Sequence, residues 1–392
     1  MTPVYLCAAR RTPFGRYGGS LATVRPDDLA ATVINGLLDL HDIPVDEVIF
    51  GCANQAGEDN RNVARMAVLL SGLGPSVPAF SVNRLSPSGL DAVIAGMRVI
   101  RDGGAEVIIA GGVDSMSRAR DVMAKPEVAF AYAPEIYDTT LGWRFVHDRI
   151  AAHNGVDSMS ETAENIAADL MLSRADQDAF AARSQTRYDA AGHAADILPV
   201  PVSGKGGDWL ISTDEHPRPT TVERLASLPS VFRAGGSVPA GNASGIDDGA
   251  AGVLLAPAVA VAKYGLTPLA RLGSAASGGV EPRAMGLGPI EAVRRLTAGT
   301  GLTPKDFDVI EINEAFAAQV SACTRAWGLA DDAPHVNAYG GAISMGHPLG
   351  ASGARIADAA ARRLSETGGK TALATLCVGV GQGVALTLHA VE

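Results

Sequence analysis

Hydrophobic residues follow two alternating rhythms along the first 116 residues of the chain. Short, nearly continuous hydrophobic runs have the length of strands, and longer runs with a hydrophobic residue every three or four positions have helical spacing. The strand-like runs are residues 3–9, 45–53, 79–85 and 105–116, and the helical runs are residues 26–41, 62–73 and 88–103. Asp27 and Asp28 favour a helix start near residue 26, because carboxylates stabilise a helix N-terminus. This alternation predicts a layered α/β fold.

The C-terminal third of the chain repeats this rhythm. Residues 307–328 contain a strand-like run, a polar motif and a helical run, as residues 45–73 do. The segments "SVNRLSPSGLDAVIAGMRVI" and "HVNAYGGAISMGHPLGASGARIADAAARRL" both pass from Val-Asn through a turn into a helical run rich in small residues. Residues 371–383 then form a closing hydrophobic strand, as residues 105–116 do. We interpret the two series as an internal duplication, with chance similarity between βα units as the alternative.

Residues 118–247 depart from the alternation. They contain two helical runs within residues 160–191 and a polar stretch rich in Gly and Pro at residues 202–221. Long insertions without a core of their own are usually functional loops or lids. We therefore interpret this region as an insertion that emerges from the first half of the fold.

Length and charge exclude several classes of protein. The chain has 392 residues, which is long for one ordinary domain and indicates two or three. Its net charge is −10 and it has no run of Lys or Arg, so we expect no nucleic-acid partner. No stretch approaches 18 uninterrupted apolar residues, and the first 16 residues lack the apolar core of a signal peptide. We therefore expect no membrane partner.

Four cysteines, Cys7, Cys52, Cys323 and Cys377, are scattered along the chain without a C-x-x-C spacing. This pattern argues against a zinc site and against a disulfide framework. The sequence therefore predicts no bound metal and a location in the reducing cytoplasm.

Four segments carry candidate chemistry. They are "NRLSPSG" with Ser86, "NEAFA" with Asn313, "GGAISMGHPLGASG" with His347 and "TLCVGVGQG" with Cys377. Each is expected at the end of a strand or the start of a helix, where α/β sheets gather their sites. A duplicated fold would bring equivalent ends from both halves to one central crevice.

Each of these residues also has a purely structural interpretation. A cysteine in an apolar run is usually an inert core residue, although the glycines after Cys377 let a backbone N–H approach a ligand closely. His347 is compatible with a helix cap or a loop hydrogen bond, and Asn313 with an ordinary helix start. The four segments together indicate a catalytic site more specifically than any one of them.

These segments, with "RTPFG", "AGGVDSMS", "SMSETAENIA" and "AGNASGIDDGA", resemble the thiolases, a family of acyl-CoA C-acyltransferases, over nearly the whole chain. The segments "LGWRF", "GVDSMSETAEN" and "DEHPR" are most similar to the β-ketoadipyl-CoA and 3-oxoacyl-CoA thiolases. The resemblance implies an α/β fold: a five-layered α-β-α-β-α sandwich from two duplicated halves plus a loop domain. We expect the N-terminal half at residues 1–117, completed by about 248–265. A CoA-binding loop domain is expected at 118–247, and the C-terminal half at 266–392.

The resemblance also implies roles for individual residues. His347 and Cys377 match the catalytic histidine and the acid/base cysteine, and Asn313 matches the asparagine that holds a water beside the histidine in one oxyanion hole. The backbone N–H groups of residue 86 and Gly379 match a second oxyanion hole. The residues that match those holding CoA or lining its pantetheine channel are Arg218, Phe232, Ala243, Ser244, Met159 and Ala315.

The implied activity is thiolytic cleavage of 3-oxoacyl-CoA by CoA, or the reverse Claisen condensation. Coenzyme A and acetyl-CoA are then substrates, no cofactor is bound covalently, and the protein is a homodimer or homotetramer. Thiolases similar to the short-chain acetoacetyl type carry a histidine where this chain has Ser158. This difference favours a longer or carboxylated 3-oxoacyl group.

Ser86 stands where thiolases carry their nucleophilic cysteine, and Pro87 follows where a small residue is expected. Three interpretations are open. In the first interpretation the chain is an engineered Cys-to-Ser form of a thiolase, and its reaction is slow because serine lacks an accessible anion. A single engineered change does not account for Pro87. Alternatively, Ser86 is a natural nucleophile with His347 as its base. In the third interpretation the protein binds CoA without catalysis, and Ser86 caps a helix that has Pro87 at its first position.

Overall fold

The computed structural model describes residues 2–54, 57–130, 132, 134–204 and 207–391. Ten strands form one mixed sheet in the order β12-β13-β14-β11-β1-β10-β5-β3-β4, with β2 paired to β10. The strands are β1 (Val4–Arg11), β2 (Gly15–Arg16), β3 (Glu47–Gly51), β4 (Ala79–Val82), β5 (Ile108–Ser115), β10 (Asp247–Pro257), β11 (Ala270–Gly279), β12 (Val309–Ile312), β13 (Thr371–Val378) and β14 (Gln382–His389).

The two halves of this sheet have the same topology. In the first half β4 and β5 run parallel to β3, whereas β10 is antiparallel to both β5 and β1. In the second half a bridge at Val336 and strand β13 run parallel to β12, whereas β14 is antiparallel to both β13 and β11. The halves join through β1 and β11 with only two paired positions. The repeated strand order confirms the duplicated α/β fold, and the exact boundaries of the halves stay predictions.

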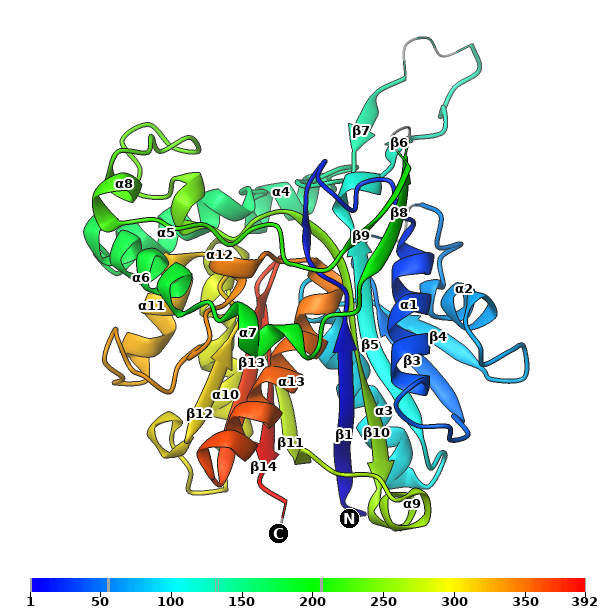
Figure 1. Ribbon diagram of the computed structural model, residues 1–392. Helices are drawn as coiled ribbons and strands as arrows, with labels where there is room; N and C mark the ends of the chain where they lie inside the picture. The colour runs from blue at the N-terminus through cyan, green and yellow to red at the C-terminus, as the bar shows by residue number, and fades with distance from the viewer. Residues whose placement is uncertain (1, 55–56, 131, 133, 205–206, 392) are drawn as a thin grey trace.

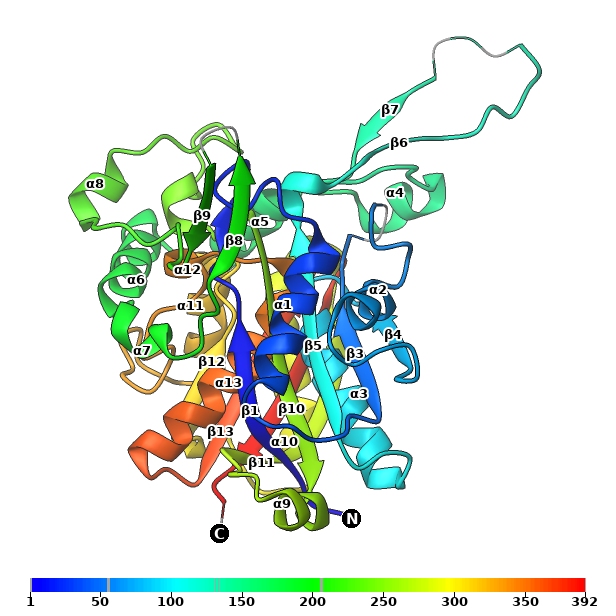
Figure 2. The same cartoon turned by 45° about the vertical axis from the view of Figure 1, so that its right-hand side comes forward.

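Helices form three layers around the two halves of the sheet (Figures 1 and 2). Helices α3 (Ser88–Asp102) and α13 (Leu349–Thr367) lie at the centre, and α13 contacts strands of both halves. The outer layer of the first half contains α1 (Pro26–Leu38) and α2 (Val63–Leu70). The outer layer of the second half contains α10 (Gly288–Thr297) and α11 (Ala317–Ala326). This arrangement is the five-layered sandwich that the resemblance implies.

The two central helices cross so closely that their backbones touch. A Cβ atom added to Gly353 would lie 2.1 Å from the backbone nitrogen of Leu90, and one added to Gly89 would lie 2.3 Å from the carbonyl oxygen of Gly350. Real Cβ atoms do not make contacts of this length, so only glycine fits at the crossing. The close approach brings together the turns that precede the two helices.

The insertion between β5 and β10 lies over one end of the sandwich. Its elements are β6 (Asp121–Met123), β7 (Ile136–Asp138), α4 (Asp148–Asn154), α5 (Met159–Asp169), α6 (Arg174–Arg187), α7 (Ala190–Ala194), β8 (Val200–Gly204), β9 (Gly207–Ile211) and α8 (Val222–Ala226). A buried ion pair between Arg11 and Asp214, 2.7 Å long, ties the insertion to β1. The hairpin β6–β7 projects away from the body (Figure 2). No helix of the described residues is both long and apolar enough to cross a bilayer.

The start of α3 differs from the expected cap. Pro87 is the N-cap residue, and the helix begins at Ser88, one residue later than an N-cap at Ser86 would place it. The hydroxyl of Ser88 accepts a hydrogen bond from the N–H of Arg84 and donates one to the carbonyl of Leu85. Ser88 therefore closes the turn, and Ser86 does not cap the helix.

Candidate active site

A cavity of about 420 Å³ lies between the sandwich and the insertion. Ten of the eleven residues singled out from the sequence line it, namely Ser86, Met159, Arg218, Phe232, Ala243, Ser244, Ala315, His347, Cys377 and Gly379. The eleventh, Asn313, is fully buried, and its side-chain nitrogen contacts Nε2 of His347. The fold therefore brings the four reactive segments of both halves to one site.

Ser86 lies in the turn between β4 and α3. The preceding residue, Leu85, has a left-handed backbone with φ +56°, and its N–H donates to the side-chain oxygen of Asn83. A non-glycine residue in this conformation stores strain, which is common at functional sites. The turn ends β4 at Val82, three residues before the predicted end. Ser86 is half-buried, and its hydroxyl makes no hydrogen bond with any described residue.

Three side chains hold His347 in one orientation. Its backbone N–H donates to Asp247 over 2.8 Å, and its Nδ1 atom lies 2.6 Å from the hydroxyl oxygen of Ser352. The same hydroxyl donates to the carbonyl of Pro348 over 2.9 Å, so it accepts the Nδ1–H proton of His347. The side-chain amide of Asn313 lies 3.3 Å from Nε2. These contacts describe a neutral imidazole with the proton on Nδ1 and a lone pair on Nε2.

The electrostatics of the site keep this imidazole neutral. Burial, and to a smaller extent the positive charge of Arg355, lowers the pKa of His347 to about 3. The side-chain oxygen of Asn313 is buried without a hydrogen-bond partner, so it offers a place for a polar ligand group or a water. A neutral imidazole with a fixed orientation has the form that can accept a proton at Nε2.

Cys377 lies near the end of β13 with its thiol in an apolar cluster that includes Met159 and Phe316. Burial raises the pKa of this thiol to about 12, so it rests protonated. Two residues later, a Cβ atom on Gly379 would lie 3.1 Å from the side chain of Leu85. Val380 then adopts φ +65°, which is rare for a β-branched residue. The tight turn places the backbone of Gly379 against the Ser86 turn.

The opposite wall of the cavity comes mainly from the insertion. Ser244 donates its N–H to the carbonyl of Ala315 over 3.0 Å, so the insertion is joined to the second half at the cavity. The backbone N–H of Arg218 donates to Gln185, and burial lowers the pKa of its guanidinium, which lies 3.3 Å from the ring nitrogen Nε2 of His216. Phe232 is 42% exposed at the rim.

Asp247 and Ser352 are site residues that the sequence reasoning did not single out. Burial raises the pKa of Asp247 to about 7 and lowers that of His216, 3.6 Å away, to about 4. His216 is therefore neutral near pH 7, whereas Asp247 loses its proton around that pH. In the sequence, Asp247 lies within the motif "GIDDGA", and Ser352 lies five residues after His347 in the predicted helix. These positions are the signals from which the two residues could be found.

Asp114 is a third such residue. Its buried carboxylate accepts hydrogen bonds from the N–H groups of Ala53, Asn54 and Gly350, the last over 2.6 Å. Gly350 lies in the first turn of α13, so this carboxylate fixes the helix whose N-terminus adjoins His347. Among the described residues, no cluster of His, Cys, Asp and Glu could hold a metal ion.

Two family models match the chain in succession. The thiolase N-terminal domain matches residues 4–259, and the thiolase C-terminal domain matches residues 266–390. The chain belongs to the thiolase family.

Individual thiolases are similar over the full length. A β-ketoadipyl-CoA thiolase of Pseudomonas putida is 54% identical over 100% of both chains. A 3-oxoadipyl-CoA/3-oxo-5,6-dehydrosuberyl-CoA thiolase of Escherichia coli K12 is 53% identical, also over 100% of both. The crystal structure of human mitochondrial 3-ketoacyl-CoA thiolase in complex with CoA superposes with a TM-score of 0.90 at 36% identity, covering 100% of this chain and 98% of that one. The thiolase fold is therefore shown as well as the family.

Proposed function

We propose that this thiolase transfers acyl groups between a 3-oxoacyl-CoA and CoA through the cavity that Ser86, His347 and Cys377 line. The family supports thiolytic cleavage of 3-oxoacyl-CoA or the reverse condensation. The observation that carries the proposal is the convergence of these side chains, from both halves of the duplicated fold, on one cavity. Ser86 belongs to the first half, and the other two belong to the second.

Each group has a role that fits its geometry. Nε2 of His347 accepts the proton of the nucleophile at residue 86 in place of the Asn313 amide N–H that lies 3.3 Å away, because Nδ1–H is held by Ser352 and the lone pair is on Nε2. Once protonated, Nε2–H and a water held by Asn313 face the thioester oxygen of the second substrate. The N–H groups of residue 86 and Gly379 bind the other oxyanion. The Cys377 thiol donates its proton to the departing CoA thiolate or to the enolate carbon of acetyl-CoA. The Cys377 thiolate formed in this way takes a proton back from the α-carbon of acetyl-CoA or from the CoA thiol in the next step.

Serine at position 86 lowers the rate in this proposal. A thiolate forms near neutral pH when an imidazole accepts its proton, whereas a serine hydroxyl has no accessible anion and needs a base in direct contact. Among the described residues, the Ser86 hydroxyl forms no hydrogen bond with His347. A serine without a base in direct contact accords with slow acylation. A serine nucleophile activated by His347 on substrate binding, and a CoA-binding protein without catalysis, are the alternatives.

CoA is the proposed substrate of the cavity, with no covalently bound cofactor. The positions that match CoA-holding residues line the cavity, and Arg218 supplies a cation for a phosphate or a stacking partner for adenine. Binding in the micromolar range, roughly −8 kcal/mol, is expected because these positions do not depend on residue 86. The names of the relatives reported above favour a 3-oxoacyl chain that ends in a carboxylate.

Restoring the thiol tests the proposal. Ser86→Cys should cleave 3-oxoacyl-CoA at least ~10²-fold faster than the unchanged chain, which is the usual size of one positioned catalytic group. Ser227→Cys, which adds a thiol at the exposed end of α8, should leave the slow rate unchanged. Equal inactivity of both forms would favour the non-catalytic alternative. A fast serine form that cysteine does not improve would identify Ser86 as a nucleophile in its own right.

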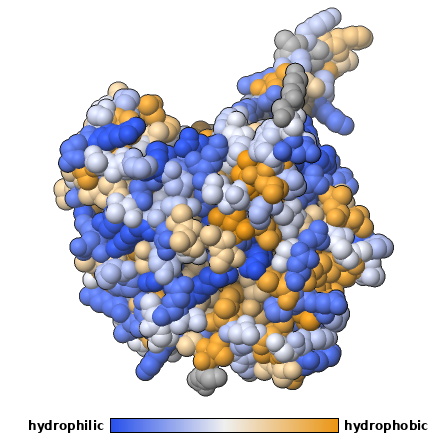
Figure 3. All heavy atoms as spheres, viewed as in Figure 1, coloured by the Kyte–Doolittle hydropathy of each residue, from blue (hydrophilic) through white to orange (hydrophobic). Residues whose placement is uncertain are grey.

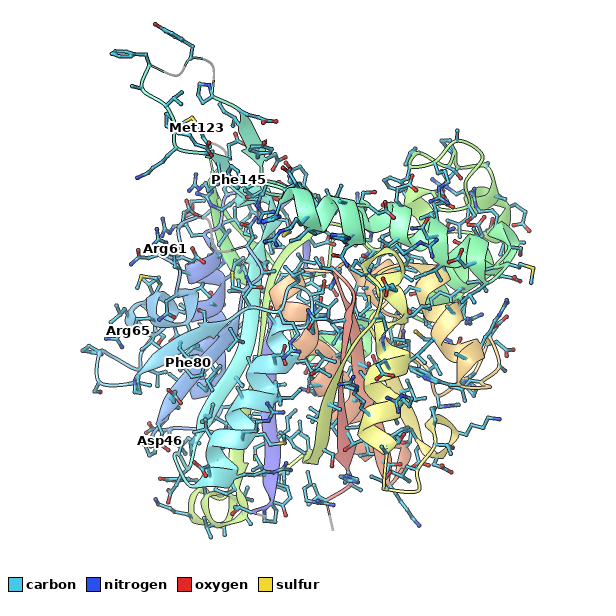
Figure 4. The ribbon with its side chains drawn as sticks, turned by 180° about the vertical axis from the view of Figure 1, so that it is seen from behind. Asp46, Arg61, Arg65, Phe80, Met123 and Phe145 are labelled. Carbon is cyan, nitrogen blue, oxygen red and sulfur yellow. The ribbon has the colours of Figure 1, made fainter. Side chains whose placement is uncertain are left out.

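The protein is also proposed to form a homodimer or homotetramer. Strand β4 is one of the two end strands of the sheet, and its Phe80 is 38% exposed (Figure 4). The hairpin β6–β7 carries Val128, Phe130 and Ile136 with exposures between 64% and 88%, and Figure 3 shows hydrophobic atoms on this projection. Light scattering after chromatography tests the state; a monomer at micromolar concentration would contradict it.

A cytoplasmic location is proposed as well. All four cysteines are buried, and no disulfide joins any two of them among the residues that the structure describes. A reducing compartment keeps both these thiols and the thiol of CoA in the form that the reaction needs. Fractionation of cells that produce the chain tests this location.

A further inference from the structure

A second cavity, of about 440 Å³, continues from the first beside Ser86. The two share Ser86, Met116, Leu141, Met159, Leu349 and Gly379 as lining residues. A group attached at residue 86 therefore has access to both. The first cavity holds the positions that match CoA-binding residues, whereas none of those positions except Met159 lines the second.

The walls of the second cavity combine apolar and polar side chains. Leu85, Leu141, Trp143 and Leu349 give it apolar walls, and Trp143 is held by a hydrogen bond from its ring nitrogen to the carbonyl of Asp157. Thr139, Thr140 and Asn54 add polar atoms, and Asn54 is itself bonded to Thr139. The cavity thus offers room for methylene groups and a polar lining for what they carry.

Arg144 is the single lining residue of this cavity with a permanent positive charge, among the residues that the structure describes. Nη1 of Arg144 lies 3.5 Å from the carbonyl oxygen of Gly142. Arg144 forms no ion pair with a carboxylate of the described residues. Most of its N–H groups are therefore available to a ligand. Its neighbour Phe145 marks this segment in Figure 4, at the base of the projecting hairpin.

One acidic residue, Asp157, also lines the cavity. Its carboxylate oxygen Oδ2 accepts a hydrogen bond of 2.9 Å from the side chain of Asn165, which is bonded in turn to the carbonyl of Arg283. Asp157 is thus engaged with α5 rather than with Arg144. The two charges lie in one cavity without an ion pair between them, so Arg144 still lacks a counter-charge.

We propose that this second cavity is the subsite for the acyl chain and that Arg144 binds a carboxylate at the far end of that chain. The substrate class is the one proposed above, a 3-oxoacyl-CoA whose chain ends in a carboxylate, and the new element is the residue that recognises this carboxylate. The inference rests on the proposed function, because it takes residue 86 as the point of acyl attachment. The inference assigns to Arg144, which has no role in the proposed reaction steps, the selection of the acyl chain.

Arg144 should distinguish acyl chains that end in a carboxylate from acyl chains that end in a methyl group. A carboxylate forms charge-assisted, often bidentate hydrogen bonds with a guanidinium, and these are roughly twice as strong as neutral ones. A chain that ends in a methyl group would remove water from Arg144 without replacing those hydrogen bonds. A site built around a polar partner therefore discriminates strongly against an analogue that lacks it.

Two CoA esters that the enzyme cannot cleave separate this effect from catalysis. Adipyl-CoA and hexanoyl-CoA have chains of the same length and differ only in the terminal carboxylate. Calorimetry on the unchanged chain should show that adipyl-CoA binds at least ~10-fold more tightly, the size of one charge-assisted hydrogen bond. Arg144→Gln should remove this preference and leave hexanoyl-CoA binding unchanged, whereas Arg144→Lys should keep part of it.

Arg149→Gln is the matched control, because Arg149 is exposed on α4 and does not line the cavity. It should change neither affinity. Hexanoyl-CoA binding also reports whether each variant is folded. An equal loss of both ligands in Arg144→Gln, or the loss of neither, would overturn the carboxylate subsite. Failure of the unchanged chain to bind hexanoyl-CoA at all would instead refute the proposed function itself.

In the Ser86→Cys background the same substitution gives a kinetic readout. Arg144→Gln should lower kcat/KM for 3-oxoadipyl-CoA by at least ~10-fold, as the loss of one charge-assisted contact predicts. The value for 3-oxohexanoyl-CoA should stay unchanged. A parallel fall for both substrates would place Arg144 among general structural residues and would contradict the subsite.

Discussion

The Nδ1 atom of His347 lies 2.6 Å from the hydroxyl oxygen of Ser352, one turn into helix α13. Because the hydroxyl donates onward to the carbonyl of Pro348, it acts as the acceptor of the imidazole proton. Ser352 therefore determines which ring nitrogen of His347 carries the lone pair, and it directs that lone pair towards Asn313 and the cavity.

Removing this hydroxyl should impair proton transfer without unfolding the protein. In the Ser86→Cys background, Ser352→Ala should lower kcat by about 10-fold or more, because the imidazole loses its fixed tautomer and orientation. The pH dependence of kcat should change with it, which a purely structural effect would not produce. Ser365→Ala, on the exposed face of the same helix, is the control and should behave as its parent. An unchanged rate for Ser352→Ala would refute this positioning role.

Cys377 should be needed for the second half of the reaction and not for the first. In the Ser86→Cys background, Cys377→Ala should still form an acyl-enzyme that intact mass spectrometry detects. It should not exchange the acyl group with acetyl-CoA, since the α-proton has no acceptor. Cys323→Ala removes a buried thiol outside the cavity and should retain full turnover. Condensation at the full rate without Cys377 would contradict the proposed mechanism.

Arg218 should contribute to CoA binding through its charge. Arg218→Ala should weaken the affinity for CoA by about 10-fold, the size of one lost hydrogen bond to a charged group. Arg224→Ala, which removes an exposed cation from α8 outside the cavity, is the comparison and should leave the affinity close to its original value. Calorimetry measures both, and an Arg218 variant with full affinity would show that this wall does not hold CoA.

The buried carboxyl of Asp247 should make stability depend on pH. Burial raises its pKa to about 7 in the folded protein, whereas in the unfolded chain it ionises near 3.8. Between these values the folded state retains a proton that the unfolded state has released, so the group's contribution to stability falls as the pH rises from about 4 to about 7. Asp247→Asn should flatten this part of the curve in denaturant unfolding at several pH values. A curve that keeps its full slope would show that Asp247 is not the group responsible.

The crossing of α3 and α13 should tolerate no side chain. Gly353→Ala should lower the free energy of unfolding by at least about 2 kcal/mol, because the new methyl group would meet the backbone of Leu90. Gly72→Ala is the matched control, since the nearest atom to its Cβ would be 3.8 Å away. Chemical denaturation measures both. Equal stability of the two variants would mean that the helices separate at little cost.

Local patterns were sufficient for the elements and for the reactive segments. The period of the hydrophobic residues depends on neighbours within a turn or a strand, so the strands around Ile109 and Leu373 and the helix around Ile356 could be predicted. The duplicated order could be predicted for the same reason. The resemblance to thiolases added the positions that gather at the cavity, and their individual roles stay predictions until the variants are measured.

The backbone of the reactive turns could not be predicted. Leu85 and Val380 adopt left-handed conformations that their side chains disfavour, and Ser88 rather than Ser86 closes the first turn. Local backbone propensity favours glycine at the positions of Leu85 and Val380. The side chain of Leu85 lies against the backbone of Gly379, and this contact between turns of the two halves exists only in the folded chain.

The sequence by itself determined the alternation of strands and helices, the repeat of that alternation and the residue types available at each turn, since these follow from short-range spacing. Only the tertiary structure decided that Asp247 and Ser352 orient His347 and that Arg144 faces the cavity beside Ser86. Asp247 lies 100 residues before His347, and Arg144 lies 58 residues after Ser86. Contacts over such separations arise from the burial of whole helix and strand faces, which no local pattern encodes.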